Sequence, residues 1–151
     1  MEISNEIKAR VFAHYLGQKM KDYCAEPEND ICTLTQVDVQ HGCVADEHGN
    51  FDIKFNDVRL LLRPPNAITD EDAIEVGRII GHDFGDYAEG KSKVLYFGKK
   101  YIQEAFDVEW INRHVQTSWQ VGQFLQLRGY DLPNYLLGGK TLHEAGLAVY
   151  K

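Results

Sequence analysis

The chain opens with apolar residues at helical spacing. Between residues 4 and 23 they recur three or four positions apart, at Ile7, Val11, Phe12, Tyr15, Leu16, Met20 and Tyr23. This pattern predicts one amphipathic helix over residues 4–23. Ser4 or Asn5 is suited to cap the start of that helix, and Pro27 excludes its continuation.

Residues 31–63 change to the period of two that is typical of strands. Residues 34–39 favour a first strand, and Phe51, Ile53 and Phe55 alternate with polar residues in a second. Turn-forming residues separate the two at 46–50. A third strand is predicted over 58–63, and its continuous apolar run favours a central or covered place in the sheet. We therefore predict a three-stranded antiparallel meander.

Two more helices are predicted in the second half. Thr69 is the expected N-cap of a helix that ends near Gly81, and a polar loop with His82 and Asp83 follows. A longer helix is predicted over 104–128, with Trp110 and Trp119 among its buried residues.

Gly122 lies in the middle of this long helix, where glycine is costly. We expect it to allow the close approach of another helix or backbone, within the chain or across a dimer.

Short elements complete the prediction. Residues 94–97 favour a short strand, Thr141 and Glu144 match a capping box, and residues 147–150 favour a terminal strand. Together the elements predict an α+β fold, with a small antiparallel sheet of about three to five strands packed against three main helices. No linker or repeat interrupts the pattern, so a single domain over residues 1–151 is expected.

The negative charge is concentrated in one quarter of the chain. The formal net charge is −7, with 16 Lys and Arg against 23 Asp and Glu. Residues 22–57 hold nine acids against the single cation Lys54, a local charge of −8. The nine acids are Asp22, Glu26, Glu28, Asp30, Asp38, Asp46, Glu47, Asp52 and Asp57. Such a segment is either a solvated face or a surface for a basic partner.

The same composition excludes several function classes. An acidic chain lacks the basic footprint that direct binding of nucleic acid requires. No apolar run is long enough to span a membrane, and the first residues do not resemble a secretory signal. Three cysteines cannot all pair within one chain, which favours a reducing, cytoplasmic location.

Motifs for catalysis and for cofactors are weak. Residues 137–141, Leu-Gly-Gly-Lys-Thr, lack the first glycine of a phosphate-binding loop, since position 134 is Asn. The His82-Asp83 pair suggests a metallohydrolase whose all-helical scaffold conflicts with the strands at 31–63. No serine lies in a G-x-S-x-G motif. We predict no catalytic, cofactor-binding or metal-binding residue from these motifs.

One cluster of cysteines and histidines leaves a metal-binding or thiol-dependent site as an alternative interpretation. Three cysteines and two histidines fall within 25 residues, with no C-x2-C pair to preform a tetrahedral site. Free thiols are the preferred interpretation. The residues are Cys24, Cys32, His41, Cys43 and His48.

Four blocks of the chain carry a resemblance: residues 6–18, 60–64, 68–73 and the ending from 128–133 through 146–147. In these blocks the chain resembles small proteins encoded by phages and prophages of gut anaerobic bacteria, a group with no established activity. The resemblance implies an accessory protein in the cytoplasm of a bacterial host, and it assigns no functional residue.

We therefore expect a non-enzymatic protein that binds an unknown partner protein through its acidic surface, as an inhibitor or adaptor. A mimic of nucleic acid is one form of this hypothesis, because the partner surface would be basic. The candidate partner-binding residues are Asp38, Asp46, Glu47, Asp52 and Asp57. The alternatives are a small metal- or Cys-dependent hydrolase, built around Cys24–His48 or His82–Asp86, and a self-assembling structural component. A homo-oligomer stays open.

Overall fold

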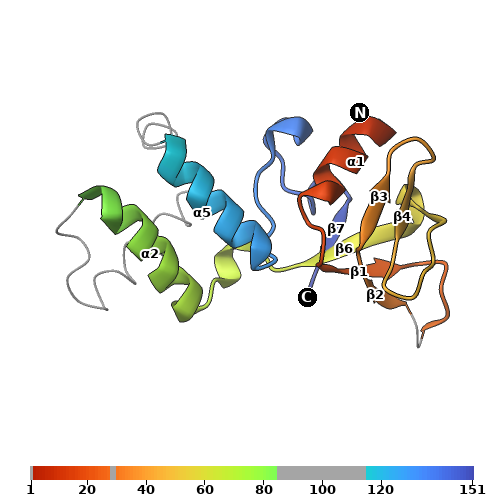
Figure 1. Cartoon of the computed structure of the whole chain (residues 1–151), viewed down its shortest axis with the longest axis horizontal. Coiled ribbons are helices and arrows are strands. Elements are labelled where there is room, and N and C mark those ends of the chain that lie inside the picture. Colours follow the sequence, from red (N-terminus) through yellow and green to blue (C-terminus); the bar gives the residue numbers. More distant parts are fainter. Residues whose placement is uncertain (1, 28–29, 85–114) are drawn as a thin grey trace. The chain divides into compact units, whose positions relative to one another are not determined.

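A computed structural model describes residues 2–27, 30–84 and 115–151 (Figure 1). In this part of the chain the fold is α+β, with three α-helices and two small sheets of four and three strands. The predicted fold class is therefore confirmed.

The chain folds into two compact units. The first comprises residues 1–62 and 131–151, and the second comprises residues 63–130, inserted between the two parts of the first. The single domain over residues 1–151 stays a prediction.

The predicted helix over residues 4–23 is wrong in its second half. Helix α1 spans Asn5–Ala13, where the Ser4 hydroxyl accepts a hydrogen bond from the Ile7 N–H at 3.2 Å. The chain then turns at Gly17, whose φ is +90°, and continues as strand β1, Lys19–Asp22. Glycine adopts this left-handed conformation without the cost that a side chain would add. The Gly17 N–H donates to the Leu34 carbonyl at 2.8 Å, so a tertiary contact holds the turn.

The four-stranded sheet has the order β2-β1-β6-β7. Its other strands are β2 (Ile31–Thr33), β6 (Val58–Leu62) and β7 (Ala148–Tyr150). The central place of β6 and the terminal strand are both confirmed, although β7 pairs with β6 in parallel. Strand β1 pairs antiparallel with both β2 and β6.

The three-stranded sheet contains β3 (Gln36–Asp38), β4 (Cys43–Ala45) and β5 (Ile53–Lys54). The predicted meander is wrong, because the 3-10 helix η2 (Phe55–Asp57) ends β5 and β6 joins the other sheet. Residues 31–38 connect the two sheets. The Leu34 N–H donates to Gln18 at 2.9 Å, whereas the Thr35 N–H donates to Ala45, also at 2.9 Å.

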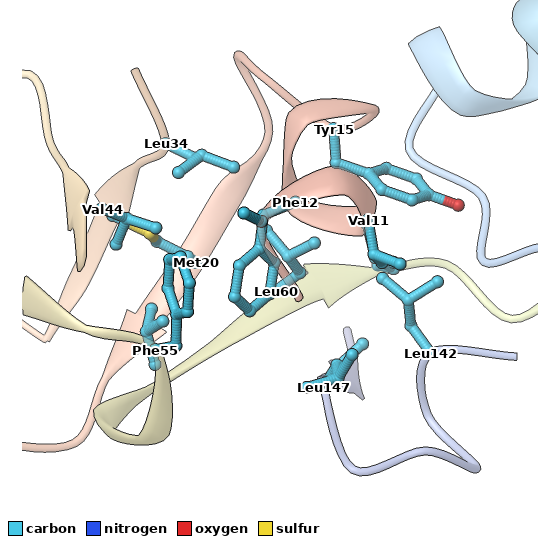
Figure 2. Close-up of a cluster of buried hydrophobic side chains, with 14 of the residues drawn as sticks. Val11, Phe12, Tyr15, Met20, Leu34, Val44, Phe55, Leu60, Leu142 and Leu147 are labelled. Carbon is cyan, nitrogen blue, oxygen red and sulfur yellow. The ribbon is translucent and has the colours of Figure 1, made fainter. Parts of the chain in front are cut away.

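The core of this unit lies between α1 and the strands (Figure 2). Helix α1 contributes Val11, Phe12 and the following Tyr15, which meet side chains from both sheets and from the C-terminal segment. The Phe12 and Phe55 rings meet edge to face, with centroids 5.3 Å apart. Burial of each such side chain stabilises the fold by roughly 1.5–3 kcal/mol.

The inserted unit contains helices α2 (Asp70–Phe84) and α5 (Val115–Leu127) and the 3-10 helix η3 (Pro65–Ala67). The predicted N-cap is confirmed, since the Thr69 hydroxyl accepts from the Asp72 N–H at 3.2 Å. His82 and Asp83 belong to α2, so their predicted loop position is wrong.

The long helix is confirmed only in its described part. Its expected start, Trp110 and the expected strand at 94–97 lie outside the described residues. Trp119 is 61% exposed, which contradicts its predicted burial. Within the described residues, a Cβ added to Gly122 would meet no atom within 4 Å, so none of these residues accounts for that glycine.

The C-terminal segment is a series of tight turns that ends in β7. The 3-10 helix η5 spans Tyr135–Leu137, and its cap Gly138 has a φ of +67°. The residues at 137–141 thus form a glycine-containing connection into a capped turn. The capping box is confirmed, because the Glu144 carboxylate accepts from the Thr141 N–H at 3.1 Å and the Thr141 hydroxyl accepts from the Glu144 N–H at 3.2 Å.

Candidate partner-binding surface

The densest group of predicted binding residues lies in one loop between β4 and β5. We call residues 46–52 the acidic loop; it contains Asp46, Glu47 and Asp52. Asp38 and Asp57 lie outside it. The structure thus brings three of the five predicted residues together and separates the other two.

Asp46 builds the loop. Its side chain is buried, and its carboxylate accepts hydrogen bonds from the N–H of His48 at 2.9 Å and of Asn50 at 3.0 Å. The Asn50 side chain donates a third bond, at 2.9 Å. Burial alone would raise the pKa of Asp46, but the bonds from Asn50 and His48 outweigh it and lower that pKa. The charge of Asp46 therefore stays, whereas its oxygens are occupied within the turn.

Glu47 connects the loop to the four-stranded sheet. One carboxylate oxygen accepts the backbone N–H of Thr33 in β2, and the other lies 3.0 Å from His48 Nε2. Hydrogen bonds from its own backbone N–H and from Thr33 lower the pKa of Glu47. The Thr33 N–H lies on the outer edge of β2, the side away from β1, so Glu47 covers a backbone donor that an edge strand would otherwise leave open.

Asp52 and Phe51 are the parts of the loop that face solvent. Phe51 is 76% exposed, and Asp52 is also exposed. Among the described residues, the Asp52 carboxylate makes no hydrogen bond and no ion pair. An exposed aromatic ring beside a carboxylate combines an apolar contact with a charge, and aromatic residues are enriched in protein interfaces.

The other two predicted residues serve local structure. Asp38 ends β3 opposite Cys43, at the end of β4 remote from the acidic loop. Its carboxylate lies 2.7 Å from His41 Nδ1, and this hydrogen bond is the main cause of the lowered pKa of Asp38. Asp57 accepts a hydrogen bond from the Cys24 thiol and so raises the pKa of that cysteine.

The cysteines and histidines of residues 24–48 do not form a metal site. Cys24 is exposed, Cys32 and Cys43 are buried, and all three thiols are free. The Cys43 thiol donates to the His41 carbonyl, with sulfur and oxygen 3.4 Å apart. Within residues 2–27, 30–84 and 115–151, no three His, Cys, Asp or Glu residues gather in a way that could hold a metal ion.

Sequence reasoning missed a basic surface on the four-stranded sheet. Lys19 and Lys21 flank the buried Met20 in β1. Arg59 of β6 is paired with Lys21, and its neighbours Val58 and Leu60 are buried. We call these three cations the basic face. The signal was the alternation over residues 19–23, which the helical interpretation of 4–23 concealed.

Two buried carboxylates also escaped notice. Asp131 accepts the N–H groups of Leu142 and His143 at 2.8 and 3.0 Å and the Tyr150 hydroxyl at 3.1 Å. Asp72 accepts from Arg128 and Tyr130. Both organise backbone and side chains within their own unit, a role for which their sequence surroundings hold no signal.

Comparison with known proteins adds no assignment. No protein-family model, no curated protein and no solved structure matches the chain. In the described part of the chain, no helix combines the length and apolar character that crossing a membrane requires.

Proposed function

We propose that this protein is a non-enzymatic accessory protein of a phage or prophage that binds a partner protein with a basic surface. It would act as an inhibitor or adaptor in the host cytoplasm. The supporting observation is the acidic loop, which presents the exposed ring of Phe51 beside the carboxylate of Asp52. The turn behind them is held by three hydrogen bonds to Asp46, so the contact is preorganised.

The acidic loop is suited both to attract a partner protein by its charge and to hold that partner by an apolar contact. Its carboxylates would attract a cationic surface over about one Debye length, and Phe51 would supply apolar area at the centre of the contact. A protein surface that normally holds nucleic acid is one basic surface of this kind.

The test compares binding-loop variants that keep the turn intact. Phe51→Ser/Asp52→Lys changes the exposed residues and leaves Asp46 and Glu47 in place. Proteins captured from a bacterial lysate by the immobilised chain are identified by mass spectrometry, and the affinity of a purified partner is measured by calorimetry. We expect the double variant to weaken binding about tenfold or more, with a steep loss as salt is added.

Matched controls separate this loop from general charge. Glu2→Lys/Glu71→Lys makes a charge change of the same sign at exposed acids elsewhere, and Tyr135→Ser removes another exposed aromatic residue. Both should bind like the original chain. A partner whose affinity is the same for the loop variant, or equally weakened by the controls, contradicts the proposal.

A further inference from the structure

The basic face gathers three cations in an acidic chain, one of which, Arg59, donates a hydrogen bond to the Gly146 carbonyl. Lys21 and Arg59 are directly opposite each other in the β1–β6 register. Like charges in that position destabilise a sheet. Both approach the ring of the half-exposed Tyr23, with Lys21 Nζ at 5.3 Å and the Arg59 guanidinium carbon at 5.8 Å from its centroid. Asp30 lies 3.8 Å from Lys21 and offsets one of the three positive charges. The other two leave the face with an excess of positive charge.

The basic face and the acidic loop adjoin each other at Thr33 in β2. The Thr33 N–H donates to Glu47 of the acidic loop, and the Thr33 hydroxyl accepts from Lys19 Nζ at 2.8 Å. The outward side chain of Ile31, 49% exposed, lies on the same strand. Opposite charges are therefore placed side by side at one edge of the sheet.

We propose that two copies of the chain bind each other about a twofold axis, with the basic face of each copy taking the acidic loop of the other. Adjacent patches of opposite sign are self-complementary under such an axis, because the same contact is made twice. Phe51 of one copy would then meet the apolar surface of Tyr23 and Ile31 on the other. The inference rests on the proposed function and deepens it, since it names a second copy as a basic partner of the acidic loop.

The charge pattern favours this occupant over a nucleic acid. A nucleic acid would bring further negative charge to a chain of net charge −7 and would leave the acidic loop unused. A second copy satisfies both surfaces. The contact area is small, because one loop meets a few short strands, so the dimer is weak and transient, with a Kd of roughly 100 µM.

The first experiment measures the mass of the full chain by sedimentation equilibrium, from about 5 µM to about 1 mM, at low and high salt. We expect a monomer–dimer equilibrium at about 50 mM NaCl that shifts towards monomer at about 500 mM. A concentration-independent monomer at low salt overturns the inference. The proposed function is still supported in that case if Phe51→Ser/Asp52→Lys weakens the binding of a different partner protein.

The second experiment exchanges the charges. Lys19→Glu/Lys21→Glu reverses two of the three charges of the basic face, and Glu47→Lys/Asp52→Lys reverses two of the three charges of the acidic loop. Circular dichroism confirms that each is folded; Lys21→Gln and Asp52→Asn replace any variant that is not. Each double variant alone should be monomeric, and an equimolar mixture should form a one-to-one dimer. The control Arg10→Glu/Lys140→Glu should dimerise normally.

Two outcomes of the exchange contradict the pairing. Variants that stay monomeric when mixed, although each is folded, show that the two surfaces do not meet. Binding of a fluorescent single-stranded oligothymidine that Lys19→Glu/Lys21→Glu abolishes, with no dimer of the original chain, shows that the basic face serves nucleic acid instead.

Discussion

Arg128 Nε lies 2.9 Å from Oδ1 of Asp72, a carboxylate that is 2% exposed. The second carboxylate oxygen accepts the Tyr130 hydroxyl at 2.7 Å and lies 3.6 Å from the Arg63 guanidinium. The backbone completes the junction, because the Arg63 N–H donates to the Gly129 carbonyl at 2.8 Å. Asp72, at the start of α2, therefore connects Arg63, the first residue of the inserted unit, with Arg128 and Tyr130 at the end of that unit.

Replacement of Asp72 should destabilise the inserted unit. Asp72→Asn keeps the size of the side chain but loses the charge and leaves Tyr130 and Arg128 less well satisfied. We expect a loss of about 1–3 kcal/mol in the free energy of unfolding. Glu71→Gln, an exposed acid of the same helical turn, should change it by a few tenths of a kcal/mol. Urea unfolding followed by circular dichroism makes the comparison, and equal stabilities of the two variants contradict the role of Asp72.

The contribution of Asp72 should depend on pH. Burial alone would raise the pKa of Asp72, but hydrogen bonds from Tyr130, Arg128 and Thr69, together with the Arg128 charge, lower it below the usual value. Because the folded pKa lies below the unfolded value of about 3.9, the stabilisation is complete above roughly pH 5 and is lost on further acidification.

The measurement is the difference in unfolding free energy between the original chain and Asp72→Asn, taken across this pH range. Other carboxylates titrate in both proteins and cancel in the difference. The difference in unfolding free energy between the two proteins should become smaller as the pH falls. A difference that stays constant or grows contradicts the lowered pKa of Asp72.

The three thiols should differ in reactivity. Cys24 is exposed, whereas burial raises the pKa of Cys32 to about 11. Since the thiolate is the reacting form, iodoacetamide at about pH 8 should label Cys24 well before Cys32. Asp57→Asn should accelerate labelling of Cys24, because the hydrogen bond to Asp57 is the main cause of its raised pKa. Asp52→Asn is the control, and peptide mass spectrometry follows each site. Equal labelling rates at Cys24 and Cys32 would refute this ordering.

Two glycine replacements should have opposite signs. Gly122→Ala in α5 should stabilise the chain by about 0.5–1 kcal/mol, because alanine favours the helix and a Cβ there would meet no atom of the described residues within 4 Å. Gly139→Ala has the same open space, but its φ of +87° makes a side chain costly by about 1–2 kcal/mol. Thermal unfolding at low and high protein concentration tests both. A destabilising Gly122→Ala whose effect grows with concentration would point to a contact between copies at that helix.

Short-range patterns predicted the elements whose signals are local. Thr69 as an N-cap, the Thr141–Glu144 capping box, the central strand β6 and the terminal strand were all readable from neighbouring residues. Each depends on hydrogen bonds or side-chain alternation within a few positions, so the chain itself holds the information. The acidic character of residues 22–57 is equally a property of the sequence.

Only the tertiary structure decided the rest. Residues 15–23 suit a helix or a strand by their apolar spacing, and the contact between Gly17 and Leu34 selects the turn and the strand. That choice brings Lys21 opposite Arg59 and so creates the basic face. The burial of Asp46, Asp72 and Asp131 likewise depends on donors that the fold brings to them. The sequence alone determined composition and local caps. Which charges meet was decided by long-range strand pairing, because strands far apart in the sequence lie side by side in the four-stranded sheet.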